Sequence, residues 1–408
     1  MIQAGLFWAV ALWLIFATLY QVSSFGALAA FLRRKSPHLK GLRPKCTILS
    51  PIRHLNAAKA ENLKDLCRLG VPVVAGIQDK DDSTLPLALQ IKAQYPDVPF
   101  TIRNSSGPPG ANRKVANLIQ MLPAAKGDIL IFTDADVRMN LPSLDPILAA
   151  FEDERVGMVT CTYKAVAGKS LRERLDVLSN NTIFLPSVTL AERIEGVRFA
   201  LGACIAVRSV VLEKIGGLEF SLDVLPDDYA LAQAVRRLGF KVALAPVLLD
   251  HCVSSPCWRA MARRHLRWAK TIKSVRPFAH SMTLLTQILP PMLTLGMLTG
   301  LAPRMLFASC YAVRLCCVAC LRSRLGLSLK DLLLLPAVDL CAFFVYLTSQ
   351  LPLPVWWDER ELVLGRWGQI RYVKNAPREG VSNRAGHTLQ EALHSPRSVP
   401  APLSVRQH

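Results

Sequence analysis

The chain has 408 residues, of which 51% are hydrophobic, and a formal net charge of +19; its mean hydropathy is +0.28. This length leaves room for one large domain with accessory segments, and the high mean hydropathy argues against an ordinary soluble domain. The positive charge does not indicate a nucleic-acid partner. Its basic residues cluster beside uncharged segments, where such residues mark the cytoplasmic side of a membrane and attract anionic lipid headgroups.

The first 32 residues carry no charge, and about 20 apolar residues are enough for a helix to cross a bilayer. A cleaved signal peptide is the alternative. It is disfavoured because the apolar run begins almost at Met1, lacks a preceding basic region and is too long. We therefore expect residues 1–32 to form a transmembrane anchor. Six basic residues follow it directly: Arg33, Arg34, Lys35, Lys40, Arg43 and Lys45.

The segment 33–276 is expected to form one cytoplasmic α/β domain. Buried strands are predicted at 46–51, 71–77, 99–103, 128–133 and 158–163. Helices are predicted at 59–69, 85–94, 114–122, 169–185 and 227–238. This alternation favours a mostly parallel sheet with helices on its faces. In such sheets ligands bind beyond the carboxyl ends of the strands.

Acidic residues stand at two of those strand ends. Asp79 follows the second predicted strand, with Asp81 and Asp82 close by as alternatives, and Asp134 and Asp136 follow the strand Ile-Leu-Ile-Phe-Thr. Alternate side chains of an extended chain point to the same side, so the Asp-Ala-Asp pair can hold a hard dication, Mg²⁺ or Mn²⁺, together with substrate phosphates. A solvated loop is the other interpretation of such a pair. Asp79 is expected to accept hydrogen bonds from a uracil or ribose.

Two further motifs can take part in group transfer. Asp227 and Asp228 open a predicted helix, and transfer to an alcohol needs a base that removes the hydroxyl proton. Asp227 is the competing choice, and capping of the helix N-terminus is its other interpretation. We prefer Asp228 as the base, because the sequence Asp-Tyr-Ala-Leu-Ala continues the helix directly from it. Lys114 begins another predicted helix after a glycine-rich loop and can reach a diphosphate, although a surface loop would look similar.

A basic amphipathic helix is predicted at the membrane interface over 258–276. Its residues Arg264, Arg267 and Trp268 are spaced to share one face. Arginines can clamp a diphosphate bidentately, and the tryptophan can lie along a sugar or lipid. A helix that only binds a membrane surface would have the same composition, but the order of the motifs favours a binding site.

The region 277–357 is expected to be a C-terminal transmembrane region with two spanning helices and a re-entrant or interfacial piece. Pro290 and Pro291 should kink or split its first uncharged run. Arg314 and Asp339 each interrupt a later run, and both are costly in hydrocarbon. They either pair with each other or lie at the interface, which the sequence slightly favours.

Two segments complete the chain. Residues 358–374 are expected to be membrane-proximal. The polar, Pro/Ser-rich tail 375–408 is expected to be disordered.

The motifs, taken in order, resemble those of the ceramide glucosyltransferases, within the inverting GT-A glycosyltransferases. The segments that carry the resemblance are Gln78-Asp79, Asn112 to Leu118, Asp134-Ala135-Asp136, Pro226 to Tyr229 and Arg264 to Trp268. The resemblance covers roughly residues 1–370. It implies a Rossmann-like GT-A domain, a UDP-sugar donor (UDP-glucose), a divalent metal and a ceramide acceptor. It also implies that Asp228 is the base and that Arg264, Arg267 and Trp268 hold the donor diphosphate and the acceptor.

The chain departs from the ceramide branch in one region. That branch has a histidine-containing segment between its second and third acidic motifs, whereas here no histidine lies between His54 and His251. Another lipid alcohol, such as a hopanoid that receives an amino sugar, is therefore an alternative acceptor. A processive polysaccharide synthase shares the motifs but needs more spanning helices, and the presence of all three acidic motifs argues against a non-catalytic relative.

The expected location is a bacterial inner membrane, with a Golgi membrane as the alternative. The absence of a cleavable leader and the Ala/Arg-rich composition favour the bacterial membrane. In both cases the catalytic domain faces the cytoplasm.

Overall fold

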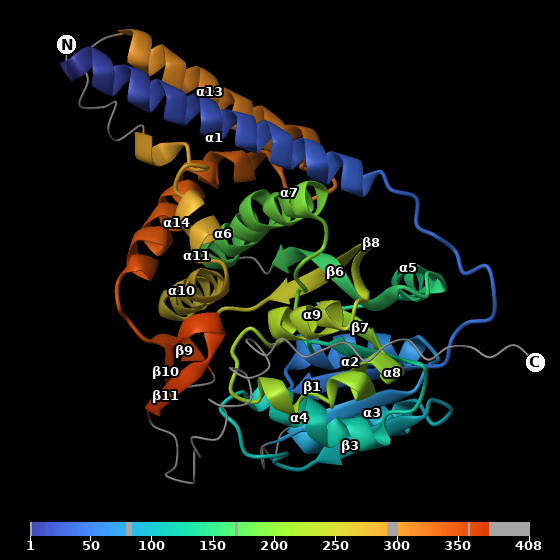
Figure 1. The fold of residues 1–408 in the computed structure, drawn as a ribbon. Coiled ribbons are helices and arrows are strands. Elements are labelled where there is room, and N and C mark those ends of the chain that lie inside the picture. Colours follow the sequence, from blue (N-terminus) through green and yellow to red (C-terminus); the bar gives the residue numbers. More distant parts are fainter. Residues whose placement is uncertain (1, 79–83, 168–169, 292–300, 358–359, 375–408) are drawn as a thin grey trace, which may run out of the picture.

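The computed structural model describes residues 2–78, 84–167, 170–291, 301–357 and 360–374 (Figure 1). Asp79, its neighbours Asp81 and Asp82, and the tail 375–408 lie outside the described residues, so the expectations for them stay predictions.

A single large sheet forms the centre of the fold. Within the described residues its eight strands follow the order β3-β2-β1-β4-β7-β6-β8-β5. Four neighbouring strands run parallel: β3 (Phe100–Asn104), β2 (Val73–Ile77), β1 (Cys46–Ile52) and β4 (Ile129–Thr133). The other four are β7 (Cys204–Arg208), β6 (Val156–Ala167), β8 (Lys241–Val253) and β5 (Val137–Arg138). β7 is antiparallel to β4 and β6, and β8 is parallel to β6. The mostly parallel sheet expected from the sequence is confirmed.

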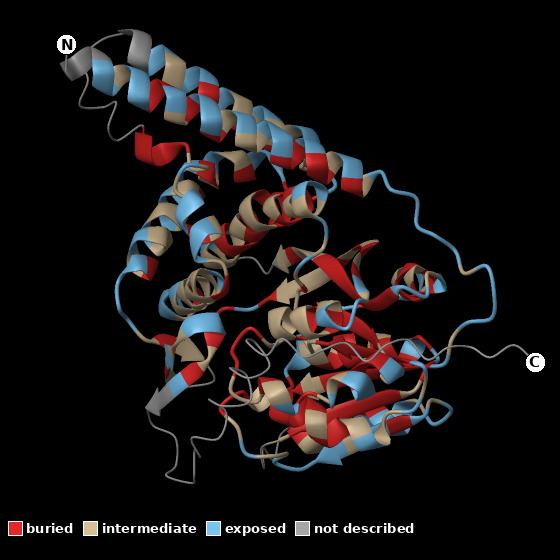
Figure 2. Ribbon diagram, in the orientation of Figure 1, coloured by how far each residue is buried: buried red, intermediate tan, exposed pale blue. Residues whose placement is uncertain are grey.

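Helices cover both faces of this sheet (Figure 1). On one face lie α2 (Ala57–Arg68), α3 (Thr84–Gln94) and α5 (Leu141–Ala149). On the other lie α4 (Arg113–Met121), α8 (Ser209–Ile215) and α9 (Asp227–Arg237). Ile131 of β4 packs toward the first layer and Leu130 toward the second. Such double burial explains why the strands are apolar throughout, and they form much of the buried interior in Figure 2. Burial of each Leu or Ile side chain in this interior stabilises the folded state by roughly 1.5–3 kcal/mol relative to leaving it exposed.

Three helices in the described part of the chain are long and apolar enough to cross a membrane: Gly5–Leu32, Arg304–Leu321 and Leu329–Gln350. They lie in α1 (Ile2–Leu32), in α13 (Leu301–Leu321), and in the 3-10 turn η5 (Leu329–Leu334) with α14 (Leu335–Gln350). α1 and α13 run side by side (Figure 1). The uncharged stretch that precedes α13 begins with the short helix α11 (Pro277–Met282). Turns and a bend follow over 283–288, and helix resumes at 289–291. Through residue 291 this stretch is therefore not one continuous helix.

Arg314 and Asp339, which interrupt the apolar runs, are paired. Arg314 Nε lies 2.7 Å from Asp339 Oδ2, and a second guanidinium nitrogen contacts the other carboxylate oxygen. Gln21 of α1 accepts from Arg314 at 2.9 Å, and the Tyr311 hydroxyl lies 3.2 Å from Asp339. The Arg314 side chain is 2% exposed. The expected pairing is therefore confirmed, because a charge enclosed between helices is held there by a partner charge. The position of the pair relative to the membrane interface stays a prediction.

A layer of helices lies between the sheet and these three helices. The helix expected over 169–185 is α6 (Leu171–Ser179), which continues through a π turn, η3 (Asn180–Phe184), into α7 (Leu185–Glu195). α7 packs along α1, whereas α6 packs against β6 and α14. The expected amphipathic helix is α10 (Trp258–Val275), which packs against α14 and α6.

The basic residues of α10 make protein contacts. Lys270 Nζ donates to the Leu351 carbonyl at 2.6 Å, and Lys273 Nζ donates to the Ser349 carbonyl at 3.2 Å. They therefore satisfy carbonyl groups at the C-terminal end of α14, which lack partners within that helix. Arg276 pairs with Glu195 at 2.7 Å. Basic residues beside an apolar segment were expected to bind lipid headgroups, whereas these three residues tie the helices together.

A second, small sheet follows α14. It consists of β9 (Val355–Trp357), β10 (Arg360–Leu364) and β11 (Ile370–Lys374), all antiparallel. The Leu225 amide donates to the Gly368 carbonyl at 2.9 Å, and the Ile370 amide donates to the Asp223 carbonyl at 2.8 Å. The sequence indicated no strands here. This sheet is docked on the loop that leads into α9.

We expect loss of either member of the Arg314–Asp339 pair to destabilise the protein. Arg314→Ala leaves a buried carboxylate without its cation, and Asp339→Ala leaves the guanidinium, so each should reduce the free energy of unfolding by about 3–5 kcal/mol. The double variant Arg314→Met/Asp339→Leu should recover most of that loss. Thermal unfolding in detergent checks this; a double variant that unfolds as early as either single variant would contradict it.

Candidate active site

The Asp-Ala-Asp motif forms a tight turn between β4 and β5. The Asp134 amide donates to the carbonyl of Ala203, the residue just before β7, at 3.0 Å. The Asp134 carbonyl accepts from the Val137 amide at 3.1 Å. The extended conformation expected from the sequence is therefore wrong, because the chain reverses here to pair β5 with β8. Both Asp134 and Asp136 nevertheless line one cavity.

Lys114 reaches Asp134 from α4. This helix starts at its N-cap Asn112, whose side chain accepts from the Val115 amide at 3.1 Å. Lys114 Nζ lies 2.6 Å from Asp134 Oδ1 and donates to the Gly202 carbonyl at 3.0 Å. Burial opposes a charge on Lys114, but Asp134 and the two carboxylates of α9 outweigh burial and raise the lysine pKa. The ammonium group therefore stays charged in the site.

His251 of β8 holds the second carboxylate of the turn. Its Nε2 lies 3.4 Å from Asp136 Oδ2. Burial alone would raise the pKa of Asp136, but the hydrogen bond from His251 and its charge reverse this and lower it. Burial likewise opposes a charge on His251, and Asp136 raises the histidine pKa. Asp136 is thus kept ionised.

The two aspartates that open α9 have different surroundings. Asp227 Oδ1 accepts from the side-chain Nδ2 of Asn112 at 3.3 Å. Asp228 accepts from the Tyr229 amide at 2.7 Å and faces Gly202, where an added Cβ would lie 3.1 Å from Asp228 Oδ2 and 3.4 Å from Lys114 Nζ. Burial, reinforced by the charge of Asp227, raises the pKa of Asp228 to about 6. Asp228 therefore has the environment that a base near neutral pH needs, and Gly202 leaves room beside it.

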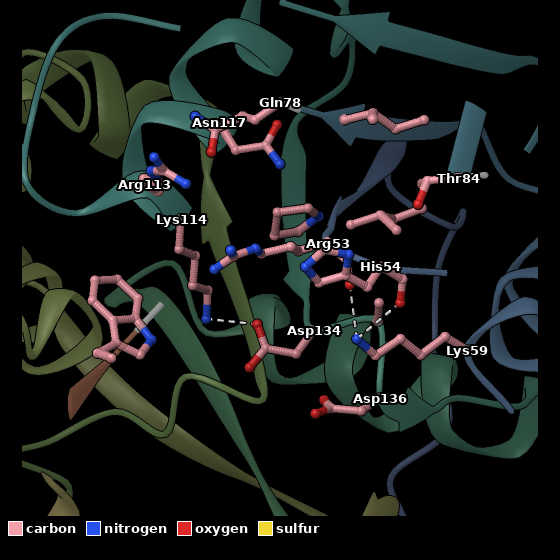
Figure 3. Close-up of a pocket in the computed structure, with 15 residues that line it drawn as sticks. Arg53, His54, Lys59, Gln78, Thr84, Arg113, Lys114, Asn117, Asp134 and Asp136 are labelled. Atoms are coloured by element: carbon pink, nitrogen blue, oxygen red, sulfur yellow. Dashed lines mark hydrogen bonds and ion pairs between the residues drawn. The ribbon is translucent and has the colours of Figure 1, made fainter. Parts of the chain in front are cut away.

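A cavity of about 260 Å³ is lined by Lys114, Asp134 and Asp136. Asp227 and Asp228 line a smaller pocket on the other side of Lys114, together with Gly202. Figure 3 shows Asp134 and Asp136 toward one end and Gln78 and Asn117 toward the other. Asn117 is fixed in place, because its Nδ2 donates to the Gly76 carbonyl at 2.9 Å. Trp357 of β9 also lines the cavity, so the small sheet contributes to this site. The position suits a ligand, since it lies beyond the carboxyl ends of β1, β2 and β4.

Helix α10, the motif helix that carries Arg264, Arg267 and Trp268, brings Arg267 close to the aspartates of the site. Burial, followed by the charge of Arg264, lowers the pKa of Arg267 to about 10, while Asp134, Asp227 and Asp228 act to raise it. Arg267 therefore lies close to the carboxylates of both motifs. It has no hydrogen-bond or ion-pair partner within the described residues.

The neighbours of Arg267 contact another acidic residue. Arg264 forms an ion pair with Asp176 of α6, and His265 Nε2 lies 2.9 Å from the same carboxylate. The Trp268 ring packs edge-on to His265, with centroids 5.5 Å apart. The structure thus brings together Lys114, Asp134, Asp136, Asp228 and Arg267. Arg264 pairs with Asp176 of α6, and the charge of Asp136 also acts on it.

Sequence reasoning missed His251, Asp176 and Gly202. No expected element contained His251, because β8 was not predicted. Asp176 carried a usable signal: it falls at a buried position of a predicted helix, and an acid there needs a partner. Gly202 gave no signal, since nothing local shows which side chains from distant elements will crowd it.

A divalent cation fits the Asp-Ala-Asp turn. No group of three or more His, Cys, Asp or Glu side chains with metal-site geometry occurs in the described part of the chain. However, Asp136 Oδ1 is buried and has no hydrogen-bond partner there. Mg²⁺ and similar hard cations are commonly held by one or two carboxylates and completed by substrate phosphates. Asp134 and Asp136 would supply such a half-built coordination shell.

Comparison with known families gives one match across most of the chain. A family model described as "Glycosyl transferase family 21" matches residues 6–370. This range includes the cavity, all three acidic motifs, α10 and the three long apolar helices.

Among solved structures, a mannosyltransferase from Pyrobaculum calidifontis in complex with GDP-Man and Mn²⁺ is similar, with a TM-score of 0.54 at 17% identity; the match covers 84% of this chain and 98% of that one. The two proteins therefore share their fold, that of the GT-A glycosyltransferases. GalNAc-T7 with UDP, GalNAc and Mn²⁺ matches with a TM-score of 0.40 at 12% identity over 59% of this chain and 52% of that one. S. aureus TarS 1–349 matches with a TM-score of 0.36 at 16% identity over 80% and 98%.

We predict that His251→Ala weakens cation binding at the turn. Removing the imidazole takes away the partner that orients Asp136, and loss of such an outer-shell group typically costs about 10- to 100-fold in metal affinity. Titration of Mn²⁺ in the presence of UDP, followed by electron paramagnetic resonance, measures this. The matched control is His38→Ala, an exposed histidine far from the turn in sequence. Equal Mn²⁺ affinity in both variants would show that His251 has no such role.

Proposed function

The chain belongs to glycosyl transferase family 21, and we propose that it transfers a hexose from a UDP-sugar to the primary hydroxyl of a membrane lipid. The preferred donor is UDP-glucose and the preferred acceptor is ceramide. One observation carries the proposal: Asp228, whose pKa is raised to about 6, lies beside the Lys114–Asp134 pair. A base and a cationic subsite for a leaving group are thus adjacent.

The donor site is proposed to lie in the cavity of Figure 3. Lys114 and Arg267 would hold the diphosphate, Asp134 and Asp136 would hold a divalent metal, and that metal would neutralise the charge that builds on the leaving diphosphate. The mannosyltransferase of the same fold was solved with a nucleotide sugar and Mn²⁺, which supports this assignment. Asp79, beyond the end of β2, is proposed to contact the uridine.

The transfer itself is proposed to be a single displacement. The acceptor oxygen attacks the anomeric carbon as the bond from that carbon to the diphosphate oxygen breaks, so the configuration inverts. The hydroxyl proton passes to Asp228. Asp228 suits this role better than Asp227, because Asp227 already contacts Asn112 at the N-terminus of α9, whereas Asp228 faces Gly202 and Lys114.

The acceptor is proposed to be a lipid because the site adjoins apolar helices. α10 carries Arg267 and Trp268 and packs against α14, which forms most of one of the three segments long enough to cross a bilayer. We propose that the protein is an integral, multi-pass protein of a bacterial inner membrane, with a Golgi membrane as the alternative, and that its catalytic domain is cytoplasmic. Trp268 would lie along the acceptor.

A second acceptor remains supported by the segment between the acidic motifs. Its Asn181 side chain donates to the Ala165 carbonyl at 3.0 Å and to the Leu325 carbonyl at 3.1 Å. This segment therefore ties strand β6 to the turn after α13, and it contains no histidine. A hopanoid or other lipid alcohol, with an amino-sugar donor, is the alternative acceptor. Synthesis of a polysaccharide is less favoured, since the described residues contain only three candidate spans.

Incubation of the purified protein with labelled UDP-glucose and a panel of lipids tests the acceptor. Ceramide, a hopanoid alcohol and a lipid-free control are compared, and products are identified by mass spectrometry. We expect a glucosylated ceramide. Sugar transfer to the hopanoid alone would select the alternative acceptor, a long polymer would select the synthase, and transfer to nothing in the panel would contradict a lipid acceptor.

We expect turnover to depend on one deprotonation near pH 6. Asp228 works as a base only when ionised, and its pKa is raised to about 6, so the active form predominates above that pH. Turnover at saturating substrate should fall about tenfold for each pH unit below 6 and level off above it. A profile that stays flat down to pH 5 would rule out this assignment.

Asp228→Asn should lower turnover by at least about 100-fold, because it removes the proton acceptor. UDP affinity, measured by isothermal titration, should stay within about threefold of that of the unmodified protein, since the loss concerns the transition state. Asp227→Asn is the matched control, with a smaller loss expected because an asparagine can still accept from Asn112. A larger loss for Asp227→Asn would exchange the two roles.

A further inference from the structure

A buried carboxylate faces the motif helix from α6. The Asp176 side chain is 2% exposed. It forms an ion pair with Arg264, lies 2.9 Å from His265 Nε2 and accepts from the Ser255 hydroxyl at 3.4 Å. Arg264 and His265 belong to α10, and Ser255 lies just before it. A single carboxylate therefore holds the first half of this helix against α6.

The charges of this cluster offset one another, although Arg264 Nε is buried without a hydrogen-bond partner within the described residues. Burial, followed by the charge of Arg264, lowers the pKa of His265 to about 4, so the imidazole is neutral at physiological pH. An ionised carboxylate can only accept, and His265 Nε2 therefore carries the proton that faces Asp176. Each carboxylate oxygen then has one partner on α10. The negative charge of Asp176 is balanced by Arg264, and the cluster as a whole is neutral.

The next turn of the same helix has the opposite character. Arg267 has no ion-pair partner within the described residues, and the charges of Asp134, Asp227 and Asp228 act on it. Successive helical residues are rotated by about 100°. Fixing positions 264 and 265 on Asp176 therefore fixes the direction in which position 267 points, which is toward the carboxylates of the site.

We propose that Asp176 is a positioning residue for the transfer reaction, and that Arg264 acts through Asp176, leaving Arg267 as the arginine that meets the donor diphosphate. This rests on the proposed function of the site. It differs from the clamp of two arginines that the sequence suggested, because the Arg264 guanidinium is held in an ion pair by Asp176.

The chain provides a matched control on the same helix. Arg174 Nε donates to Asp331 Oδ1 at 3.0 Å, and the Asp331 side chain is 4% exposed. This pair is also buried, also starts from α6 and also joins it to another element, but that element is η5. Asp331→Asn therefore reproduces the loss of a buried ion pair without touching α10.

The experiment compares Asp176→Asn with Asp331→Asn in the full chain. Melting temperature, UDP affinity by isothermal titration, and kcat and KM for UDP-glucose with the lipid that the unmodified protein glycosylates are measured. Misplacement of a reacting group by about 1 Å costs on the order of 100-fold. We expect Asp176→Asn to lower kcat/KM by about that factor and to weaken UDP binding, and Asp176→Glu to restore part of both. Asp331→Asn should lower the melting temperature while UDP affinity and kcat/KM change by less than about threefold.

A double-mutant cycle separates positioning from direct contact. If Arg264 acts through Asp176, then Arg264→Gln, Asp176→Asn and the double variant should lose similar activity, because they break the same unit. A double variant whose losses add would mean that Arg264 contacts the donor itself. Should Asp176→Asn fail to fold, Arg264→Lys is compared with Arg267→Lys. A lysine at position 264 keeps a cation beside Asp176 and should retain most of the UDP affinity, whereas a loss as large as that of Arg267→Lys would overturn the separate roles.

UDP titration keeps this inference distinct from the proposed acceptor. Unmodified protein that binds UDP but glycosylates no lipid would contradict the acceptor, and the UDP affinity of Asp176→Asn would still decide its positioning role. If Asp176→Asn binds UDP as tightly as the unmodified protein, the inference is wrong. Unmodified protein that binds no UDP would overturn both.

Discussion

Repulsion among four carboxylates, two in the turn after β4 and two at the start of α9, is the constraint on which this site depends. The turn after β4 and the start of α9 bring Asp134, Asp136, Asp227 and Asp228 together in a partly buried space, where their repulsion is little screened by solvent. Cations offset it. Lys114 pairs with Asp134 and His251 pairs with Asp136, whereas Arg267 faces the group without a partner of its own among the described residues. Asp228 is left with a raised pKa, which suits it to accept a proton.

Much of the fold follows from local patterns in the sequence. The apolar strands β1 and β4, the helices α2 and α4 and the long helix α1 were predicted within a few residues, because each has a clear period or a polar cap at its boundary. The acidic positions 134, 136 and 228 could be singled out because acids at strand and helix ends are visible locally, and the structure places them around Lys114. Their roles are still predictions. Asp79 lies outside the described residues, and its role is still a prediction.

Other features could not be predicted from the sequence because they depend on contacts between distant segments. His251 matters only because β8 pairs with β5, which places it beside Asp136. The lysines of α10 looked like lipid-binding residues, yet they bond to carbonyls at the end of α14. Arg314 and Asp339 looked equally suited to the interface, and only helix packing shows that they pair. Charge patterns indicate that partners are needed, but they do not identify them.

The layer of α6 and α10 packs against both β6 and α14, so it connects the sheet that carries the proposed donor site to an apolar helix. The most direct test is an experimental structure of the full chain with a UDP-sugar and Mn²⁺. We expect the cation on the Asp134–Asp136 turn, the diphosphate near Lys114 and Arg267, and Asp228 about 3 Å, or one water, from the path of the attacking hydroxyl at the anomeric carbon. A nucleotide bound elsewhere, or an anomeric carbon facing away from Asp228, would contradict this account.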